Sequence, residues 1–216
     1  MKYIIMCGGH YSAWETPRQL TQICGEALIA RTIRLLHDEG ADDVMISTIG
    51  AYHDDFSGFG VPVIMHDNDF AVVDGECKGA WVHAFGPRIE PACYLMGDVC
   101  YSPEAIRTIV RAETDDVLFF ASTPPFSPLY VKESAEPFAF KVVNQRRFRA
   151  AIDYVAASVN AGIFRRHPIA WELWQVLIGR NVREISYETI YAINDYTCDV
   201  DHPEDSKRIE DMICTL

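Results

Sequence analysis

Short apolar runs alternate with helix-forming stretches along the first 121 residues, and this alternation constrains the fold more than any other feature of the chain. The apolar runs have the length of buried strands. They cover 2–7, 43–47, 61–65, 93–96 and 117–121. Helical stretches follow the first run (26–39), the third (77–85) and the fourth (from 103). This order is typical of an α/β fold in which a mostly parallel central sheet carries helices on both faces.

The second half of the chain is less regular than the first. Two strands and three helices are predicted there, at 138–143 and 162–164 and at 145–157, 168–178 and 203–213. No Pro/Gly/Ser-rich linker separates the halves. We therefore expect a single domain over 1–216, in which the second half (122–216) covers a site built by the first half (1–121).

Composition excludes several classes of protein. The net charge of −12 argues against a nucleic-acid partner, which would require a basic surface. No apolar run approaches the ~20 residues that a membrane span needs. Seven cysteines, an odd number without a CxxC pair, indicate reduced thiols in a cytoplasmic protein.

Two glycines directly follow the first apolar run. Gly8 and Gly9 would let the backbone approach a ligand closely and turn its N–H groups toward a phosphate. Arg18 supplies a cation ten residues after Gly8. The stretch is not a dinucleotide-binding fingerprint, because the third glycine is missing, and it is not a Walker motif. A plain turn after the strand is the alternative.

Three aspartates are candidates for a metal site. Asp98 follows Gly97 at the end of the fourth predicted strand, where open α/β sheets bind their ligands. Asp199 and Asp201 would share one face of an extended segment, because side chains alternate along a strand. Paired carboxylates repel each other, and a hard divalent cation relieves that repulsion. The alternative for Asp98 is a solvated turn or a helix cap.

Together these segments resemble the sugar-nucleotide pyrophosphorylase and cytidylyltransferase superfamily, whose members are nucleotidyltransferases of a GT-A-like, Rossmann-like fold. The resemblance extends over nearly the whole chain through the order of its motifs. They are the glycine loop, Pro17-Arg18-Gln19-Leu20, Gly25 through Ile33, Gly97-Asp98 and Asp199 through Asp205. The chain departs from the family pattern at His10 through Trp14, where many members have further glycine and an arginine, and at Arg18, where lysine is usual.

The resemblance implies an enzyme that transfers an NMP from an NTP to a small phosphomonoester and releases pyrophosphate. It implies that Gly8 and Gly9 contact the nucleotide and that Arg18 acts on its phosphates, so that 1–121 is the nucleotide-binding half. Asp98, together with Asp199 or Asp201, would bind Mg²⁺. The partners would be an NTP and a small phosphorylated metabolite, with neither nucleic acid nor membrane; assembly of several copies of the chain is left open.

The remaining residues assigned by the resemblance concern the base and the acceptor. Gly75 belongs to the stretch 74–81, which occupies the place of the family's base-reading loop, and Asn160 belongs to a stretch that touches the acceptor. Lys132 and Lys141 are candidates for the acceptor phosphate. The tryptophan-containing loop at 10–16 and the modest chain length favour CTP, with a sugar 1-phosphate or a phosphocholine-like acceptor.

Two other functions fit the same residues. A metal-dependent glycosyltransferase of this fold would use Asp199-Val200-Asp201 as its Asp-x-Asp site, although that motif belongs in the middle of such a chain. A degenerate nucleotide-binding module would keep the pocket without turnover. The full set of carboxylates argues against the second alternative.

Overall fold

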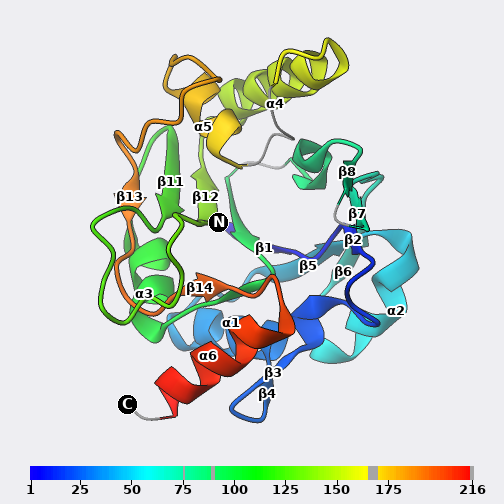
Figure 1. Ribbon diagram of the computed structural model, residues 1–216, viewed down its shortest axis with the longest axis vertical. Coiled ribbons are helices and arrows are strands. Elements are labelled where there is room, and N and C mark those ends of the chain that lie inside the picture. Colours follow the sequence, from blue (N-terminus) through cyan, green and yellow to red (C-terminus); the bar gives the residue numbers. More distant parts are fainter. Residues whose placement is uncertain (75, 89–90, 165–169, 215–216) are drawn as a thin grey trace.

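The computed structural model describes residues 1–74, 76–88, 91–164 and 170–214. Within these residues the central sheet has seven strands in the order β13-β11-β12-β9-β1-β5-β6 (Figure 1). Their bounds are Lys2–Met6 (β1), Val44–Thr48 (β5), Val63–Met65 (β6), Ala92–Met96 (β9), Val117–Ala121 (β11), Pro137–Val142 (β12) and Tyr191–Ala192 (β13). Every neighbouring pair is parallel except the two that β12 makes, so the prediction of a mostly parallel sheet is confirmed.

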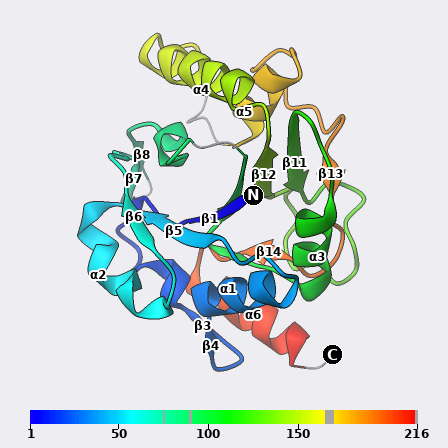
Figure 2. The ribbon, with the colours of Figure 1, turned by 180° about the vertical axis from the view of Figure 1, so that it is seen from behind.

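β1 lies in the interior of the sheet, where it pairs with β5 on one side and with β9, the middle strand, on the other. Four of its five residues are buried, as expected of an apolar strand that is covered on both faces. α1 (Leu28–Asp38) and α3 (Pro103–Arg111) lie on one side of the sheet, and α4 (Gln145–Asn160) and α5 (Ala170–Leu177) lie on the other (Figures 1 and 2). The predicted start of α3 is confirmed, since the Ser102 hydroxyl accepts a hydrogen bond from the amide of Ala105.

Aromatic side chains join α4 to the sheet. The ring of Phe85 makes edge-to-face contacts with Tyr94, Phe140 and Phe148, at centroid distances of 5.4, 5.6 and 5.1 Å. Tyr94 belongs to β9, Phe140 to β12 and Phe148 to α4. Residues from both halves of the chain therefore share one hydrophobic core.

Short strands and helices outside the main sheet bring distant segments together. β10 (Val99–Cys100) pairs with β14 (Cys198–Asp199), which places the late acidic segment beside the end of β9. Two small sheets consist of β2 (His10–Tyr11), β7 (Ala71–Val73) and β8 (Glu76–Lys78), and of β3 (Gln22–Ile23) and β4 (Glu26–Ala27). The other helices are α2 (His53–Phe56), α6 (Pro203–Ile213), η1 (Arg18–Leu20), η2 (Gly50–Tyr52), η3 (Ser57–Phe59) and η4 (Trp81–Ala84).

Two of the predicted elements are wrong. The stretch 77–85 forms the end of β8 and the short 3₁₀ helix η4 instead of an α-helix. Gly79 interrupts it with a φ of +73°, at a point where an added Cβ would lie 2.3 Å from the Asp69 carbonyl oxygen. The stretch 162–164 is not a strand, because α4 continues to Asn160 and Gly162, with a φ of +64°, turns the chain. Residues 168–169 of the predicted helix 168–178 lie outside the described residues.

The expectation of reduced thiols is wrong for one pair of cysteines. Cys24, at the tip of the β3–β4 hairpin, forms a disulfide with Cys214 at the end of α6. Four of the remaining cysteines are buried, namely Cys7, Cys93, Cys100 and Cys198. The disulfide attaches the C-terminal helix to the segment that follows Arg18.

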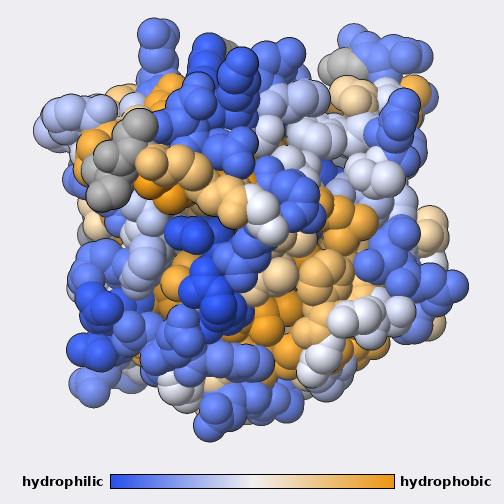
Figure 3. All heavy atoms as spheres, turned by 90° about the horizontal axis from the view of Figure 1, so that it is seen from below, coloured by the Kyte–Doolittle hydropathy of each residue, from blue (hydrophilic) through white to orange (hydrophobic). Residues whose placement is uncertain are grey.

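The surface is not uniformly polar. Seen from below the view of Figure 1, apolar residues gather across the middle of the molecule, and hydrophilic residues surround them (Figure 3). Among the helices of the described residues, none combines the length and the apolar character of a membrane span.

Candidate functional site

A cleft of about 230 Å³ lies where the parallel strands end. β1 and β9 approach it with their carboxyl ends, followed by Gly8 and by Gly97-Asp98. Because β12 is antiparallel, it begins at this same edge, and Glu136 directly precedes it. The cleft is thus lined from both halves of the chain, as open α/β sheets commonly bind ligands.

Two glycines shape the floor of the cleft. A Cβ added to Gly97 would lie 2.4 Å from the Met6 carbonyl oxygen, so only glycine allows β9 to pass β1 this closely. The amide of Gly97 donates to that same oxygen at 3.0 Å. Gly8 faces the ring of His66, which a Cβ on Gly8 would approach to 2.5 Å. Both positions therefore require glycine, because neighbouring protein atoms already occupy the space of a side chain.

Arg18 connects two of the predicted aspartates. Its guanidinium is buried, forms an ion pair with Asp98, and donates to the Asp201 carboxylate at 2.7 Å. The ring of Tyr11 lies 3.9 Å from the guanidinium carbon, in cation–π contact. The Nε of Arg18 is buried and has no hydrogen-bond partner among the described residues. Sequence positions 18, 98 and 201 therefore meet at one point of the cleft.

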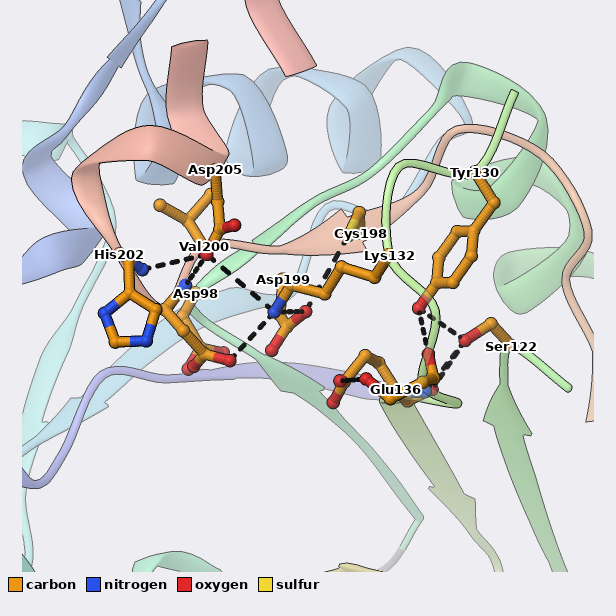
Figure 4. Close-up of polar contacts among 12 residues, drawn as sticks. Asp98, Ser122, Tyr130, Lys132, Glu136, Cys198, Asp199, Val200, His202 and Asp205 are labelled. Carbon is orange, nitrogen blue, oxygen red and sulfur yellow. Dashed lines mark hydrogen bonds and ion pairs between the residues drawn. The ribbon is translucent and has the colours of Figure 1, made fainter. Parts of the chain in front are cut away.

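A second cation, Lys132, lies beside Asp199 (Figure 4) and also pairs with Asp201. Its ammonium is 2.5 Å from Asp199 Oδ1 and 2.8 Å from Asp201 Oδ2, and its side chain is 11% exposed. Burial acts to lower the pKa of Lys132, but the charges of Asp199 and Asp201 outweigh it and raise that pKa above its ordinary value. Lys132 is therefore a charged lysine that is held by two carboxylates of the cleft.

Three carboxylates could hold a metal ion. Glu136, Asp199 and Asp201 each offer an oxygen within 4.8 Å of the other two. Burial, and then the nearby charge of Glu136, raises the pKa of Asp199 well above its ordinary value; burial also raises the pKa of Glu136. Asp201 behaves differently: burial acts to raise its pKa, but Arg18, the hydrogen bond with Asp199 and Lys132 together outweigh that effect and lower the pKa. Crowded carboxylate oxygens of this kind fit a hard divalent cation such as Mg²⁺ or Mn²⁺.

The acidic segment is held in place by its surroundings. The indole of Trp14 donates to the backbone oxygen of Asp201 at 2.9 Å. The Asp205 carboxylate accepts hydrogen bonds from the amides of Asp201 and His202, at 3.1 and 2.9 Å, at the start of α6. These contacts fix the backbone of Asp201, so its two carboxylate oxygens are directed at Arg18 and Lys132.

The segment that carries Lys132 and Glu136 is likewise ordered by hydrogen bonds (Figure 4). The Ser122 hydroxyl donates to the Tyr130 hydroxyl at 2.8 Å and accepts from the Glu136 amide at 2.8 Å. The Tyr130 hydroxyl donates to the Ser134 carbonyl at 3.0 Å. The loop between β11 and β12 is thereby closed into a compact turn that presents both charged side chains to the cleft.

The structure gathers most of the predicted site residues in the cleft. Gly8, Arg18, Asp98, Asp199 and Asp201 all line it, and Gly9, with a φ of +96°, follows Gly8. Gly75 lies outside the described residues.

Two predicted residues lie elsewhere. Asn160 is exposed at the last turn of α4 and does not line the cleft. Lys141 is buried near the opposite end of β12, where its ammonium donates to the carbonyls of Ile109, Val110 and Ala112 at 3.0, 2.8 and 2.6 Å. Lys141 therefore caps the end of α3, away from the cleft, and its contact with an acceptor phosphate stays a prediction from the sequence.

Glu136 is the charged residue that sequence analysis missed. A strand was expected from 138, so a residue just before it was known to lie at a sheet edge. Only the antiparallel direction of β12 brings that position to the same edge as Asp98. The sequence carries no local signal for this direction.

Comparisons of the sequence find no matching family model and no matching curated protein. Solved structures do resemble the chain. One is described as a glucose-1-phosphate thymidylyltransferase from Bacillus anthracis in complex with sucrose, with a TM-score of 0.61 and 16% identity over 100% of this chain and 96% of that one. Another is the 4-diphosphocytidyl-2C-methyl-D-erythritol synthase from Anaerococcus prevotii, with a TM-score of 0.58 and 9% identity over 99% and 96%.

The chain has the fold of the sugar-nucleotide pyrophosphorylases and cytidylyltransferases. A third structure, Rv0371c from Mycobacterium tuberculosis in complex with manganese, covers 98% of each chain at 15% identity with a TM-score of 0.50. The resemblance inferred from the motifs is thus confirmed at the level of the fold. Sequence identities this low support the fold alone. The reaction has to be argued from the residues of this chain's own cleft.

Proposed function

We propose that this protein is a nucleotidyltransferase that transfers an NMP from an NTP, with CTP favoured, to a small phosphomonoester and releases pyrophosphate. One observation carries the proposal. Arg18 and Lys132 alternate with Asp98, Asp201 and Asp199 at the carboxyl edge of a sheet of this fold. A site with both cations and clustered carboxylates suits the reaction of two phosphates, which needs charge neutralisation more than covalent chemistry.

The acceptor phosphate would attack the α-phosphorus of the NTP as the bond to the leaving pyrophosphate breaks. Gly8 and Gly9 present backbone without side chains to the triphosphate. Arg18 would hold the β- and γ-phosphates through its planar fork and stabilise the departing pyrophosphate. Lys132 would offset the negative charge that accumulates between the two phosphates.

Glu136, Asp199 and Asp201 are the residues that would hold Mg²⁺, with Asp98 as the further carboxylate at this edge. When bound, the ion would neutralise phosphate charge and orient the two reacting phosphates. The donor set supports this assignment, since buried and mutually repelling carboxylates are stabilised by a hard cation. The manganese complex of Rv0371c, a protein of the same fold, is consistent with it.

The base would lie beside Gly8. Both ring nitrogens of His66 and the amide nitrogen of Asn68 are buried there without a hydrogen-bond partner among the described residues. Tyr11 and Phe70 supply apolar surface to the cleft on which a base could stack, and His66 and Asn68 lie behind Gly8, outside the cleft lining. CTP, and an acceptor of the sugar-1-phosphate or phosphocholine type, remain the proposed substrates, with Gly75 and Asn160 proposed as substrate contacts from the resemblance alone.

A matrix of substrates tests the proposal. The purified protein would be incubated with each NTP, with Mg²⁺ or Mn²⁺, and with a panel of phosphomonoesters, while released pyrophosphate is measured. Release that needs both the acceptor and the metal, and that Asp199→Asn removes, is the expected result. Release of an NDP in the presence of a sugar nucleotide would instead identify a glycosyltransferase, and binding of NTP without any product would identify a nucleotide-binding module.

A further inference from the structure

The ammonium of Lys132 lies between two carboxylates, at the position that the proposed metal ion would take. Its Nζ lies 2.5 Å from Asp199 and 2.8 Å from Asp201, and 3.9 Å from Asp205. Oxygens around Mg²⁺ or Ca²⁺ lie about 2.0–2.6 Å from the ion. An ammonium group and a divalent ion cannot both occupy such a position, because they would share the same oxygens at almost the same distance.

The charges of the cleft lead to the same conclusion. Asp98, Glu136, Asp199 and Asp201 contribute four negative charges when ionised, and Arg18 and Lys132 contribute two positive ones. The net charge is then minus two, which one divalent cation would neutralise. With Lys132 withdrawn from the oxygens but still beside them, the loaded site is close to neutral before any phosphate arrives.

We propose that Lys132 is a placeholder for the metal ion: its ammonium bridges Asp199 and Asp201 in the metal-free protein and leaves them when the ion binds. The inference rests on the metal site of the proposed function. The ammonium that is released stays at the rim of the cleft, on the ordered loop between β11 and β12. It is then free to pair with a phosphate, so metal loading converts Lys132 from an internal partner into a substrate-binding group.

A permanent structural salt bridge is the competing explanation. In that case the ammonium would remain on the carboxylates, and the metal would bind elsewhere. The two explanations predict opposite effects of removing the lysine. Loss of a placeholder frees the oxygens and strengthens metal binding, whereas loss of a structural bridge loosens the segment that carries the ligands and weakens it.

Binding of Mn²⁺ to the nucleotide-free protein, followed by the EPR signal of free Mn²⁺, tests the proposal without any turnover. Three proteins would be compared: wild type, Lys132→Met and Arg208→Met. Arg208 is exposed and lines the same open groove as Lys132, so its variant controls for the loss of one nearby positive charge. We expect Lys132→Met to bind Mn²⁺ roughly tenfold more tightly or better, and Arg208→Met to stay within about twofold of wild type because an exposed charge is screened.

Lysine acylation of the wild-type protein, read by mass spectrometry, provides a measurement that needs no variant. Lys132 should label slowly in the metal-free protein and severalfold faster with Mg²⁺, whereas the exposed Lys78 should label at one rate throughout. Three results would each overturn the exchange. They are equal labelling of Lys132 in both states, an Mn²⁺ affinity of Lys132→Met no higher than that of Arg208→Met, and no Mn²⁺ binding by any of the proteins. Tighter Mn²⁺ binding in Lys132→Met together with no pyrophosphate release by wild type would uphold the exchange and refute the proposed reaction.

Discussion

Lys141, which is buried, and Lys132, whose side chain is 11% exposed, lie near opposite ends of β12 and have opposite surroundings. Lys132 precedes the strand and is held by the carboxyl groups of Asp199 and Asp201. Lys141 lies near the end of the strand and is held by three backbone carbonyls at the end of α3. Burial acts to lower the pKa of both, yet the carboxylates raise the pKa of Lys132, while that of Lys141 remains lowered.

The difference separates a lysine available for chemistry from a lysine that maintains the fold. Carboxylate partners can be taken over by a metal ion, and the ammonium can then turn to a phosphate. Backbone carbonyls at a helix end have no such second partner, so Lys141 stays where it is. Both lysines looked equivalent as candidates for the acceptor phosphate in the sequence, because neither their spacing nor their neighbours reveal what they contact.

The largest expected effect is on turnover. Lys132→Met should reduce the kcat of pyrophosphate release by about 100-fold or more, as loss of a preorganised charged donor usually does. Lys141→Met should keep kcat within about twofold per folded molecule. The measurement is steady-state pyrophosphate release at saturating NTP and Mg²⁺, normalised to the folded fraction from circular dichroism. Equal losses in both variants would break the comparison.

Stability, in contrast to turnover, should depend on Lys141 at the far end of β12. Lys141→Met removes the donor from the carbonyls of Ile109, Val110 and Ala112, which then remain buried without it. We expect the free energy of unfolding to fall by about 1–3 kcal/mol. Urea denaturation measures it, with Lys78→Met, on the exposed strand β8, as the control that should stay within about 0.5 kcal/mol. A fully stable Lys141→Met protein would contradict the capping role.

At the cleft end of β12, the affinity for Mn²⁺ should depend on Glu136. Glu136→Gln removes one charged oxygen from the cluster with Asp199 and Asp201 and should weaken Mn²⁺ binding by about tenfold. Glu133→Gln, an exposed residue of the same loop, should leave the affinity almost unchanged. Isothermal titration calorimetry without nucleotide distinguishes them. Equal Mn²⁺ affinities of the two variants would mean that Glu136 is not a ligand of the metal ion.

The smallest expected effect is on the pH dependence of stability, and its sign differs between the two lysines. The pKa of Lys132 is raised in the folded protein, so its contribution is full below the ordinary value of 10.5 and is lost as pH rises from there toward the folded pKa. The pKa of Lys141 is lowered, so the cost of burying its charge is present below the folded pKa and is relieved as pH rises toward 10.5.

Urea denaturation of wild type and both Met variants, from about pH 8 to about pH 11.5, isolates these contributions. The difference between wild type and Lys132→Met should shrink above pH 10.5. The difference between wild type and Lys141→Met should grow as pH approaches 10.5, with either slope at most about 1.4 kcal/mol per pH unit. Slopes of the same sign would mean that the two environments are not as different as their contacts indicate.

The first half of the site could be predicted because strand ends carry its residues. Gly8 and Asp98 follow apolar runs that read clearly as strands, and the carboxyl ends of parallel strands meet at one edge. Asp199 and Asp201 were assigned from motif order, and the pairing of β14 with β10 is what brings them to Asp98. The strand ends and the acidic motif are local patterns of the sequence, whereas the pairing that joins them is a long-range contact.

What could not be predicted depends on contacts between distant segments. The direction of β12 decides whether Glu136 faces the cleft or the opposite edge, and both directions suit the same apolar run. The Cys24–Cys214 disulfide joins residues 190 positions apart, and their spacing carries no signal of it. The stretch 77–85 has an apolar pattern suited to a helix, but the close approach of Gly79 to Asp69 overrides that local preference.

The contact between Gly97 and Met6 has a mechanical consequence. Asp98 follows a point where the backbones of β9 and β1 touch, so its backbone cannot shift unless the two strands separate. Lys132 comes from a loop and Asp201 from the segment before α6, and neither belongs to the main sheet. The cleft therefore has one wall anchored in the central sheet and one wall held by the side-chain hydrogen bonds of a loop and of the segment before α6, and we expect any adjustment to a ligand on the second wall.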